Sequence, residues 1–314
     1  MIRFLAIRLG LIGVTLGVIS VAIFAVTEVL PGDVAAQILG QGATAENLES
    51  VRQQLNLDRP AAVRYLDWMG GTVRGDLGES LVQRRPITDI LGSRIGNSVI
   101  LASFTFLVAI PAAVAAGVWA GVRRNTLGDR VVSVGSLIAI SLPEFVTGVL
   151  LIIIFSSTLG WLPSSSLVEA GTNPLTRPAI LVMPVLTLTG VLFAYIMRMT
   201  RANVIEVLEA NYVRSAILKG LPMRRVILRH VVPNAMLPTI SVIMMNIGWL
   251  LGGLIIVENV FSYPGVGRLL LTSITTRDVP LLQTIALMIA AVYAFSNLFA
   301  DLAYAWLNPR IRYA

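Results

Sequence analysis

The chain has 314 residues, of which 56% are hydrophobic and 13% are charged, and its mean hydropathy is +0.80. This composition is too apolar for a soluble domain and predicts a protein embedded in a lipid bilayer. The chain has no cysteine, which excludes disulfides, thiol catalysis and cysteine-ligated metals. The net charge of +7 does not indicate nucleic-acid binding, because the basic residues alternate with apolar segments as membrane topology requires.

Six apolar segments are long enough to cross about 30 Å of hydrocarbon, which takes about 20 residues of helix. We therefore expect an all-α integral membrane protein with six transmembrane helices, at residues 9–29, 98–122, 131–157, 179–197, 235–257 and 281–306. The first segment could instead be a cleaved signal peptide, since Arg3 and Arg8 precede it. Its apolar stretch exceeds the usual ~7 to 15 residues and no clean Ala-x-Ala site follows, so we expect a retained helix.

The distribution of basic residues predicts the orientation. An even number of spans places both termini on one side, and this side also holds segment 198–234 and a large excess of arginine over acidic residues. The positive side should be cytoplasmic. We accordingly expect a first transmembrane helix with a cytoplasmic N terminus (1–29), a periplasmic or outer segment (30–96) and a five-helix transmembrane core (97–314).

The outer segment is too long for a simple hairpin. Thr44 can cap a short amphipathic helix that ends before Pro60, and a second short helix is expected over Ala61–Met69. These helices could contact the outer leaflet or an outer docking protein, or they could seal the first transmembrane helix against its neighbours. The sequence leaves these alternatives open.

Glu144 follows Pro143 about 13 residues into the third span, which is near the middle of the membrane if that span is one straight helix. A carboxylate at this depth is costly unless it faces a polar pathway. Pro143 interrupts the helical hydrogen bonds and can expose carbonyl groups to the same pathway. We predict that Pro143 and Glu144 line a polar pathway through the membrane or the gate of such a pathway. The alternative is a protonated or hydrogen-bonded Glu144 that fixes helix packing.

Segment 198–234 is a polar, cationic island between two apolar spans. Glu206–Leu218 contains good helix formers, Gly220-Leu-Pro222 should end that helix, and Met223–Val231 should form a second one. Two short helices joined by a tight turn can insert into a groove on a soluble partner, with exposed arginines steering it to an acidic rim. The alternative is a loop that only satisfies the inside-positive rule and touches lipid headgroups.

No phosphate-binding loop for nucleotide hydrolysis is possible. The only lysine, Lys219, is followed by Gly220, where the motif Gly-x-x-x-x-Gly-Lys requires serine or threonine next. If transport is driven by ATP, another chain must therefore hydrolyse it. We expect no catalytic residue, no resident cofactor and no metal in this chain, and ATP with Mg²⁺ on partner subunits.

Two kinds of motif make the chain resemble the permease subunits of ATP-binding-cassette (ABC) importers. In the EAA loop of those permeases, a glycine follows a Glu-Ala-Ala start and precedes Leu-Pro at a fixed interval. Gly220 and Val232-Pro233 keep this interval, and Ala216 keeps the second alanine. Further stretches match the peptide and nickel branch: Leu30–Asp33, Gly75–Ser80, Arg198–Arg201, Asn211–Ala216, Glu258–Gly267 and Asn308–Arg312.

The resemblance implies a type I ABC importer permease fold with both termini cytoplasmic, in a bacterial inner membrane. It implies four kinds of protein or lipid partner: a second homologous permease, two ATP-binding subunits, an extracytoplasmic solute-binding protein and membrane lipid. Small peptides are the commonest cargo of the branch, and nickel complexes, opines and oligosaccharides are the alternatives. The scarcity of charged residues in the spans weakly disfavours bare Ni²⁺.

The resemblance also assigns site residues. ATPase coupling is expected from Tyr212, Arg214, Ala216, Lys219, Gly220, Leu221, Arg224, Arg225 and Pro233. The stretch after the fifth span faces the binding protein and the external gate in this branch, and its turn can fold back toward the cavity mouth. This adds Glu258, Tyr263, Pro264 and Gly265 to the gate candidates, with an ordinary turn as the alternative.

Two other classes of protein are less consistent with the residues. A stand-alone transporter driven by protons through Glu144 would need internal repeats and several buried ionisable groups. The chain offers one acid in mid-span and no convincing repeat. An intramembrane hydrolase would need a partner for His230 at membrane depth, but this histidine lies in the cationic island.

Overall fold

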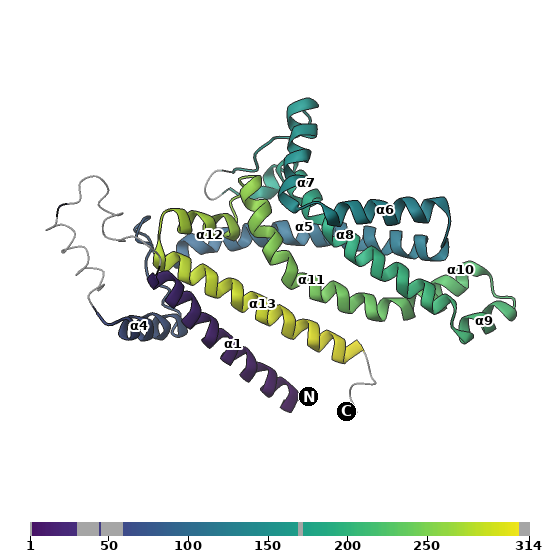
Figure 1. Ribbon diagram of the computed structural model, residues 1–314, viewed down its shortest axis with the longest axis horizontal. Coiled ribbons are helices and arrows are strands. Elements are labelled where there is room, and N and C mark those ends of the chain that lie inside the picture. The colour runs from purple at the N-terminus through teal and green to yellow at the C-terminus, as the bar shows by residue number, and fades with distance from the viewer. Residues whose placement is uncertain (1, 30–43, 45–58, 169–171, 308–314) are drawn as a thin grey trace. The chain divides into compact units, whose positions relative to one another are not determined.

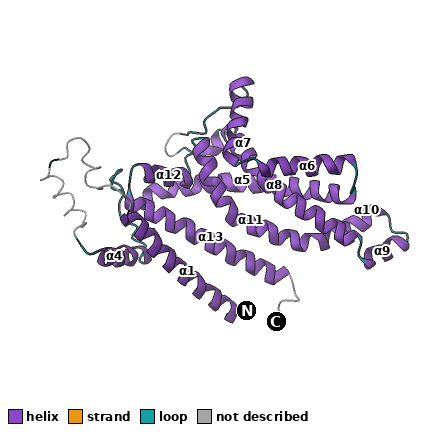
Figure 2. Cartoon of the chain, in the orientation of Figure 1, coloured by secondary structure: helices purple, strands orange, loops and turns teal. Residues whose placement is uncertain are grey.

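In the computed structural model the described residues are 2–29, 44, 59–168 and 172–307. They are almost entirely helical and contain no β-strand (Figure 2). The helix expected between Thr44 and Pro60 lies outside these residues, as do the first and last of the short motifs. Figure 1 labels the elements, which are α1 (Ile2–Val29), α4 (Ala61–Val73), α5 (Ile87–Val122), α6 (Leu127–Ser141), α7 (Glu144–Leu151), the π-helix η2 (Ile152–Thr158), the 3₁₀ helix η3 (Pro174–Thr176), α8 (Ala179–Leu208), α9 (Asn211–Leu218), α10 (Met223–Val226), the π-helix η4 (Ile227–Val231), α11 (Val232–Val260), α12 (Val266–Thr275) and α13 (Val279–Leu307).

Five helices among the described residues are long and apolar enough to cross a membrane, and a sixth span exists if one bent pair of helices is counted. The five are α1, α5, α8, the helix from Met223 to Val260, and α13. The all-α membrane fold predicted from the sequence is therefore confirmed. The helix expected over Ala61–Met69 is also present, and it continues to Val73.

The single straight helix expected over 131–157 is wrong. The chain bends by 104° between α6 and α7. Leu142 adopts an extended conformation before Pro143, as the ring of a following proline favours, and α7 restarts with Glu144 as its first residue. Glu144 is thus at a helix start beside a sharp bend, so its depth no longer follows from counting residues along one helix.

The described chain divides into two compact units. The first comprises residues 1–96 and 265–294 and has a core formed by Ile87, Ile90, Leu91, Val266, Leu269, Leu281 and Ile285. Ser80 and the backbone N–H of Leu81 both donate hydrogen bonds to the Asp278 carboxylate, which is buried. These bonds fix the loop before α5 to the turn before α13 within this unit.

The second unit comprises residues 97–264 and 295–314, and α8 lies at its centre. In the most apolar part of α8, 72% of the residues are buried, which is far more than in any other span. Helices α5, α6, α7 and α11 pack around it. A methyl group added at Gly117 of α5 would lie 2.6 Å from Cβ of Thr200, and one at Gly121 would lie 2.7 Å from Cγ1 of Val204. The missing side chains at these glycines therefore let α5 lie directly against α8.

Candidate functional site

The cationic island forms a helix, a tight turn and a second helix, as the sequence predicts (Figure 1). The first helix, α9, begins at Asn211 rather than Glu206, because α8 continues to Leu208 before the chain turns. The second does not end at Val231 as expected. It continues through the π-helical turn η4 into α11, so that one helix extends from Met223 to Val260. We call residues 211–233 the docking segment.

Gly220 gives the docking segment its turn. Its φ is +76°, a left-handed conformation that other residues adopt at a cost. Its N–H donates to the Ile217 carbonyl at 2.9 Å, closing the end of α9, and Pro222 then starts α10. A methyl group added at Gly220 would meet no atom of the described chain within 4 Å. Within this chain, the glycine is therefore needed for the backbone and not for packing.

One face of the docking segment is buried on the body of its unit. The cluster contains Val204 of α8 together with Val213, Ala216, Val226, Val231 and Ala235. Leu221 packs against this cluster from the turn, and so do Val118 and Val122 of α5. Ala216 and Leu221, both predicted as coupling residues, thus anchor the segment to its own chain.

The other face is exposed and combines apolar and cationic side chains. Leu218 is 81% exposed, Met223 is 52% exposed and Tyr212 is 47% exposed. The predicted coupling residues Arg214, Lys219, Arg224, Arg225 and Pro233 are exposed as well. This face therefore offers several apolar side chains surrounded by cations, a surface that a protein partner could cover. The charged residues of this face could be predicted from the sequence, whereas Leu218 and Met223 could not, because hydropathy does not indicate which apolar side chains are exposed.

An ion pair joins α6 to α8, the helix that precedes the docking segment. Arg201 Nε lies 2.6 Å from Oδ1 of Asp129, and Arg201 Nη2 lies 2.8 Å from Oδ2. Asp129 is 2% exposed and also accepts from the N–H of Asn125 and the hydroxyl of Ser133. Sequence reasoning did not pair these residues, although Arg201 lies in a motif stretch. The spacing Gly117-x-x-x-Gly121 was a second signal that it missed.

The predicted gate residues at the end of α11 and in the turn after it are buried. Glu258 and Tyr263 are both 0% exposed. Ser98 donates a hydrogen bond to Glu258 Oε1 at 2.5 Å, and Tyr263 Oη donates to the carbonyl of Asn97 at 2.8 Å. The amide of Asn97 in turn donates to the carbonyl of Pro264 at 2.9 Å. These bonds join the turn after α11 to α5. Burial, and then the charge of Glu258, raise the pKa of Tyr263, so its hydroxyl stays a donor.

The remaining gate candidates lie elsewhere. Gly265 belongs to the first unit, where it precedes α12 in an extended conformation. Pro143 is exposed, Glu144 is half-buried and Phe145 beside them is 52% exposed. The structure therefore separates the candidates into a buried, hydrogen-bonded group and a more accessible pair at the 104° bend.

The comparisons with known proteins agree with the sequence motifs. Residues 113–313 match the family of binding-protein-dependent transport system inner membrane components, and residues 1–85 match the N-terminal part of such components. Two relatives, from Escherichia coli strain K12 and from E. coli O6:H1 strain CFT073, are each 40% identical over 305 residues. A third, from Shigella flexneri serotype 5b, is 39% identical over the same length.

All three relatives are called glutathione transport system permease protein GsiC, and the match covers 97% of this chain and 97% of each relative. The family consists of transport permeases, which favours an importer subunit over a stand-alone proton-driven transporter. The chain therefore belongs to the family of binding-protein-dependent transport system inner membrane components and is a multi-pass permease of the inner membrane.

Proposed function

We propose that this permease forms half of the translocation pathway of an ABC importer and couples to a separate ATPase through the docking segment, residues 211–233. The observation that carries the proposal is the exposed apolar tip of the segment, Leu218 and Met223, surrounded by arginines and Lys219. Leu218 is 81% exposed and adjoins Lys219, so apolar and cationic surface lie next to each other at this tip. A protein groove with an acidic rim accommodates both kinds of side chain.

ATP hydrolysis belongs to the partner. The single lysine of this chain lies at the docking turn and lacks the hydroxyl residue that a phosphate-binding loop requires after it. We propose two ATP-binding subunits, a second homologous permease and an extracytoplasmic binding protein as the other members of the complex. The excess of basic residues on the side of the docking segment supports a cytoplasmic position for it.

The cargo we propose is a small peptide. The relatives carry glutathione in their names, so glutathione is the first solute to test, with dipeptides as competitors. Nickel complexes, opines and oligosaccharides remain the alternatives. We assign Glu144 and Pro143, at the bend between α6 and α7, to the pathway, and the buried group around Glu258, Tyr263 and Pro264 to the external gate, where its hydrogen bonds would hold the closed form.

The docking proposal is tested with Leu218→Asp, which places a charge in the exposed tip while leaving the buried cluster intact. The permease is purified with its ATPase subunits, and both the amount of bound ATPase and its stimulation by loaded binding protein are measured. We expect at least about a tenfold loss of ATPase binding, as for the truncation of a buried interface anchor.

The matched control is Leu167→Asp, because Leu167 is 59% exposed and lies outside the docking segment. This variant should bind ATPase as the wild type does. If Leu218→Asp and Leu167→Asp both retain full binding and stimulation, the docking segment does not contact the ATPase and the proposal is wrong.

A further inference from the structure

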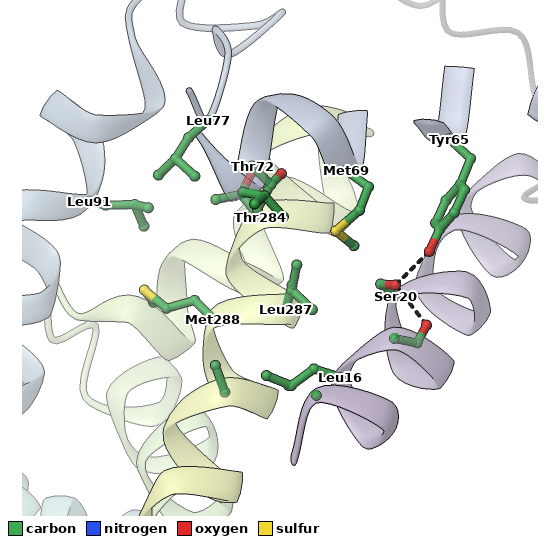
Figure 3. Close-up of a pocket in the computed structure, with 14 residues that line it drawn as sticks. Leu16, Ser20, Tyr65, Met69, Thr72, Leu77, Leu91, Thr284, Leu287 and Met288 are labelled. Carbon is green, nitrogen blue, oxygen red and sulfur yellow. Dashed lines mark hydrogen bonds between the residues drawn. The ribbon is translucent and has the colours of Figure 1, made fainter. Parts of the chain in front are cut away.

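A groove of about 500 Å³ lies within the first compact unit, residues 1–96 and 265–294 (Figure 3). Its walls are α1, α4, the start of α5 and α13. Most of the lining is aliphatic or glycine, and among the larger side chains are Leu16, Met69, Leu77, Leu91, Leu287 and Met288. The volume is in the range of pockets that bind small apolar ligands.

The groove exists because α1 is held mainly along the half that ends at Val29. Gln283 of α13 donates a hydrogen bond to Oγ1 of Thr27 at 2.7 Å, and Ser20 hydrogen-bonds with Tyr65 of α4 at 2.9 Å (Figure 3). The ring of Phe24 packs on Tyr65 and Trp68. Even so, only 6% of the most apolar stretch of α1 is buried. The residues of α1 from Gly13 to Ser20 line the open groove and have no helix of the described chain packed against them on that side.

The position of the groove restricts what can fill it. Two of its walls, α1 and α13, are helices long and apolar enough to cross a membrane. At that depth the surrounding medium is lipid acyl chain and not water, and an apolar wall of this kind does not hold water. A transmembrane helix of a partner subunit is about 10 Å wide, so this volume would admit roughly one helical turn. An extended acyl chain is thinner and fits the space better.

A polar residue that lines the groove, Thr284, adds a second, independent indication. Oγ1 of Thr284 is buried, and it has no hydrogen-bond partner among the described residues. Buried threonines on other helices, such as Thr187 and Thr239, donate to the carbonyl four residues earlier. A buried hydroxyl without a partner is costly. The ester carbonyl of a phospholipid is an acceptor that would satisfy it at the end of an acyl chain.

We propose that this groove binds one acyl chain of a bilayer phospholipid, with the hydroxyl of Thr284 donating to the ester carbonyl. The lipid fills the space between α1 and α13 and adds apolar contacts to a helix that has few of its own. This site is separate from the docking segment and does not depend on the identity of the cargo.

The test uses phosphatidylethanolamine with a photoreactive acyl chain, incorporated into membranes that contain the full-length permease with its partner subunits. After extraction and washing in detergent, irradiation labels only lipid that stays bound, and peptides are mapped by mass spectrometry. We expect labels on α1 near Leu16 and on α13 near Leu287. Gly17→Leu, which fills part of the groove, should reduce them about tenfold or more, given the contribution of each buried methylene.

Two further variants make the result specific. Gly10→Leu is the matched control, because Gly10 is also on α1, also has open space beside it and does not line the groove. It should retain the wild-type label. Thr284→Val keeps the shape but removes the donor, and should reduce the label about threefold to tenfold.

The proposal is overturned if the label is spread evenly along α1, if it is equally strong in the Gly17→Leu and Gly10→Leu variants, or if the wild-type protein keeps no label after washing in detergent. A Thr284→Val variant with the full label would refute the hydrogen bond to the ester carbonyl.

Discussion

Asp129 and Arg201 form a two-point ion pair between the first turn of α6 and α8, with N···O distances of 2.6 and 2.8 Å. The side chain of Asp129 is 3% exposed and that of Arg201 is 28% exposed. The pair lies directly before the end of α8, from which the docking segment continues. We therefore predict that this pair supports the docking segment.

We expect Asp129→Asn to lower the free energy of unfolding by about 3 to 5 kcal/mol, since it leaves the half-buried guanidinium of Arg201 without its counter-charge. Thermal unfolding in detergent measures the change. Glu209→Gln is the control, because it breaks the exposed pair of Arg124 and Glu209 and should cost about 0 to 1 kcal/mol. Equal losses in the two variants would contradict the supporting role of Asp129.

Gly117→Ala should be destabilising, because its methyl group would lie 2.6 Å from Cβ of Thr200 and 2.7 Å from the carbonyl oxygen of Met197. Overpacking of this kind costs about 1 to 3 kcal/mol. Gly135→Ala in α6 should have the opposite sign, since a methyl group there meets nothing and alanine favours a helix by up to about 1 kcal/mol. The two melting temperatures in detergent should move in opposite directions, and a stabilised Gly117→Ala variant would show that α5 and α8 do not pack this closely.

At Gly220, three substitutions separate backbone strain from contact with the ATPase. Gly220→Ala should destabilise the turn by about 1 to 2 kcal/mol because φ is +76°. Gly220→Asn tolerates this conformation better and should fold normally. Gly220→Trp combines strain with bulk and should abolish stimulation of the ATPase while the protein still inserts into the membrane. Wild-type stimulation in the tryptophan variant would mean that the partner does not approach this turn.

Tyr263→Phe removes the donor to the partly buried carbonyl of Asn97 and should cost about 1 to 3 kcal/mol of stability. The raised pKa of Tyr263 gives a matching pH dependence. The neutral form is favoured in the folded state, so its contribution is complete below the ordinary pKa of 10.0 and is lost as the pH rises above it. The difference between wild type and Tyr263→Phe should shrink in strongly alkaline buffer, whereas Tyr195→Phe, at a half-exposed tyrosine, should show little difference at any pH.

For Glu144, uptake in proteoliposomes separates a pathway role from packing. Glu144→Gln should reduce uptake of a peptide with a free amino group by an amount equivalent to about 1 to 3 kcal/mol, as for a charged hydrogen bond, without loss of inserted protein. With ATP held constant and no pH gradient, wild-type accumulation should continue. If Glu144→Gln transports almost as well as the wild type, the carboxylate contributes only to helix packing. If a protonophore abolishes wild-type uptake, transport is driven by protons.

The sequence predicts what depends on local pattern. Five continuous spans follow from hydropathy, and the turn at Gly220 follows from a glycine and a proline placed two residues apart. The third span was misjudged because residues 131–157 are apolar throughout, and hydropathy does not register the direction of the chain on either side of Pro143. Asp129 and Arg201 are 72 positions apart, so only the fold brings them together.

The candidate site, too, could be predicted from the sequence only in part. The charged residues of the docking segment could be named from their motif and from the inside-positive rule. Their separation into an anchored and an exposed face could not, because it depends on Val204 of α8 and on Val118 and Val122 of α5, which pack under the segment. For the same reason the sequence did not predict the burial of Glu258 and Tyr263, because their hydrogen-bond partners on α5 are far away in the sequence.

The helix that starts at the docking turn does not stop until Val260, after 38 residues. At about 1.5 Å per residue its path is roughly 55 Å long, which exceeds the thickness of the hydrocarbon layer. Leu221 adjoins one end, and Glu258 lies at the other. The docking turn and the hydrogen-bonded Glu258 are therefore joined by one helix, with no loop between them. The π-helical turn η4, Pro233 and Pro238 interrupt its regular hydrogen bonds, so we expect bending of this helix to be concentrated in the half nearer the docking turn.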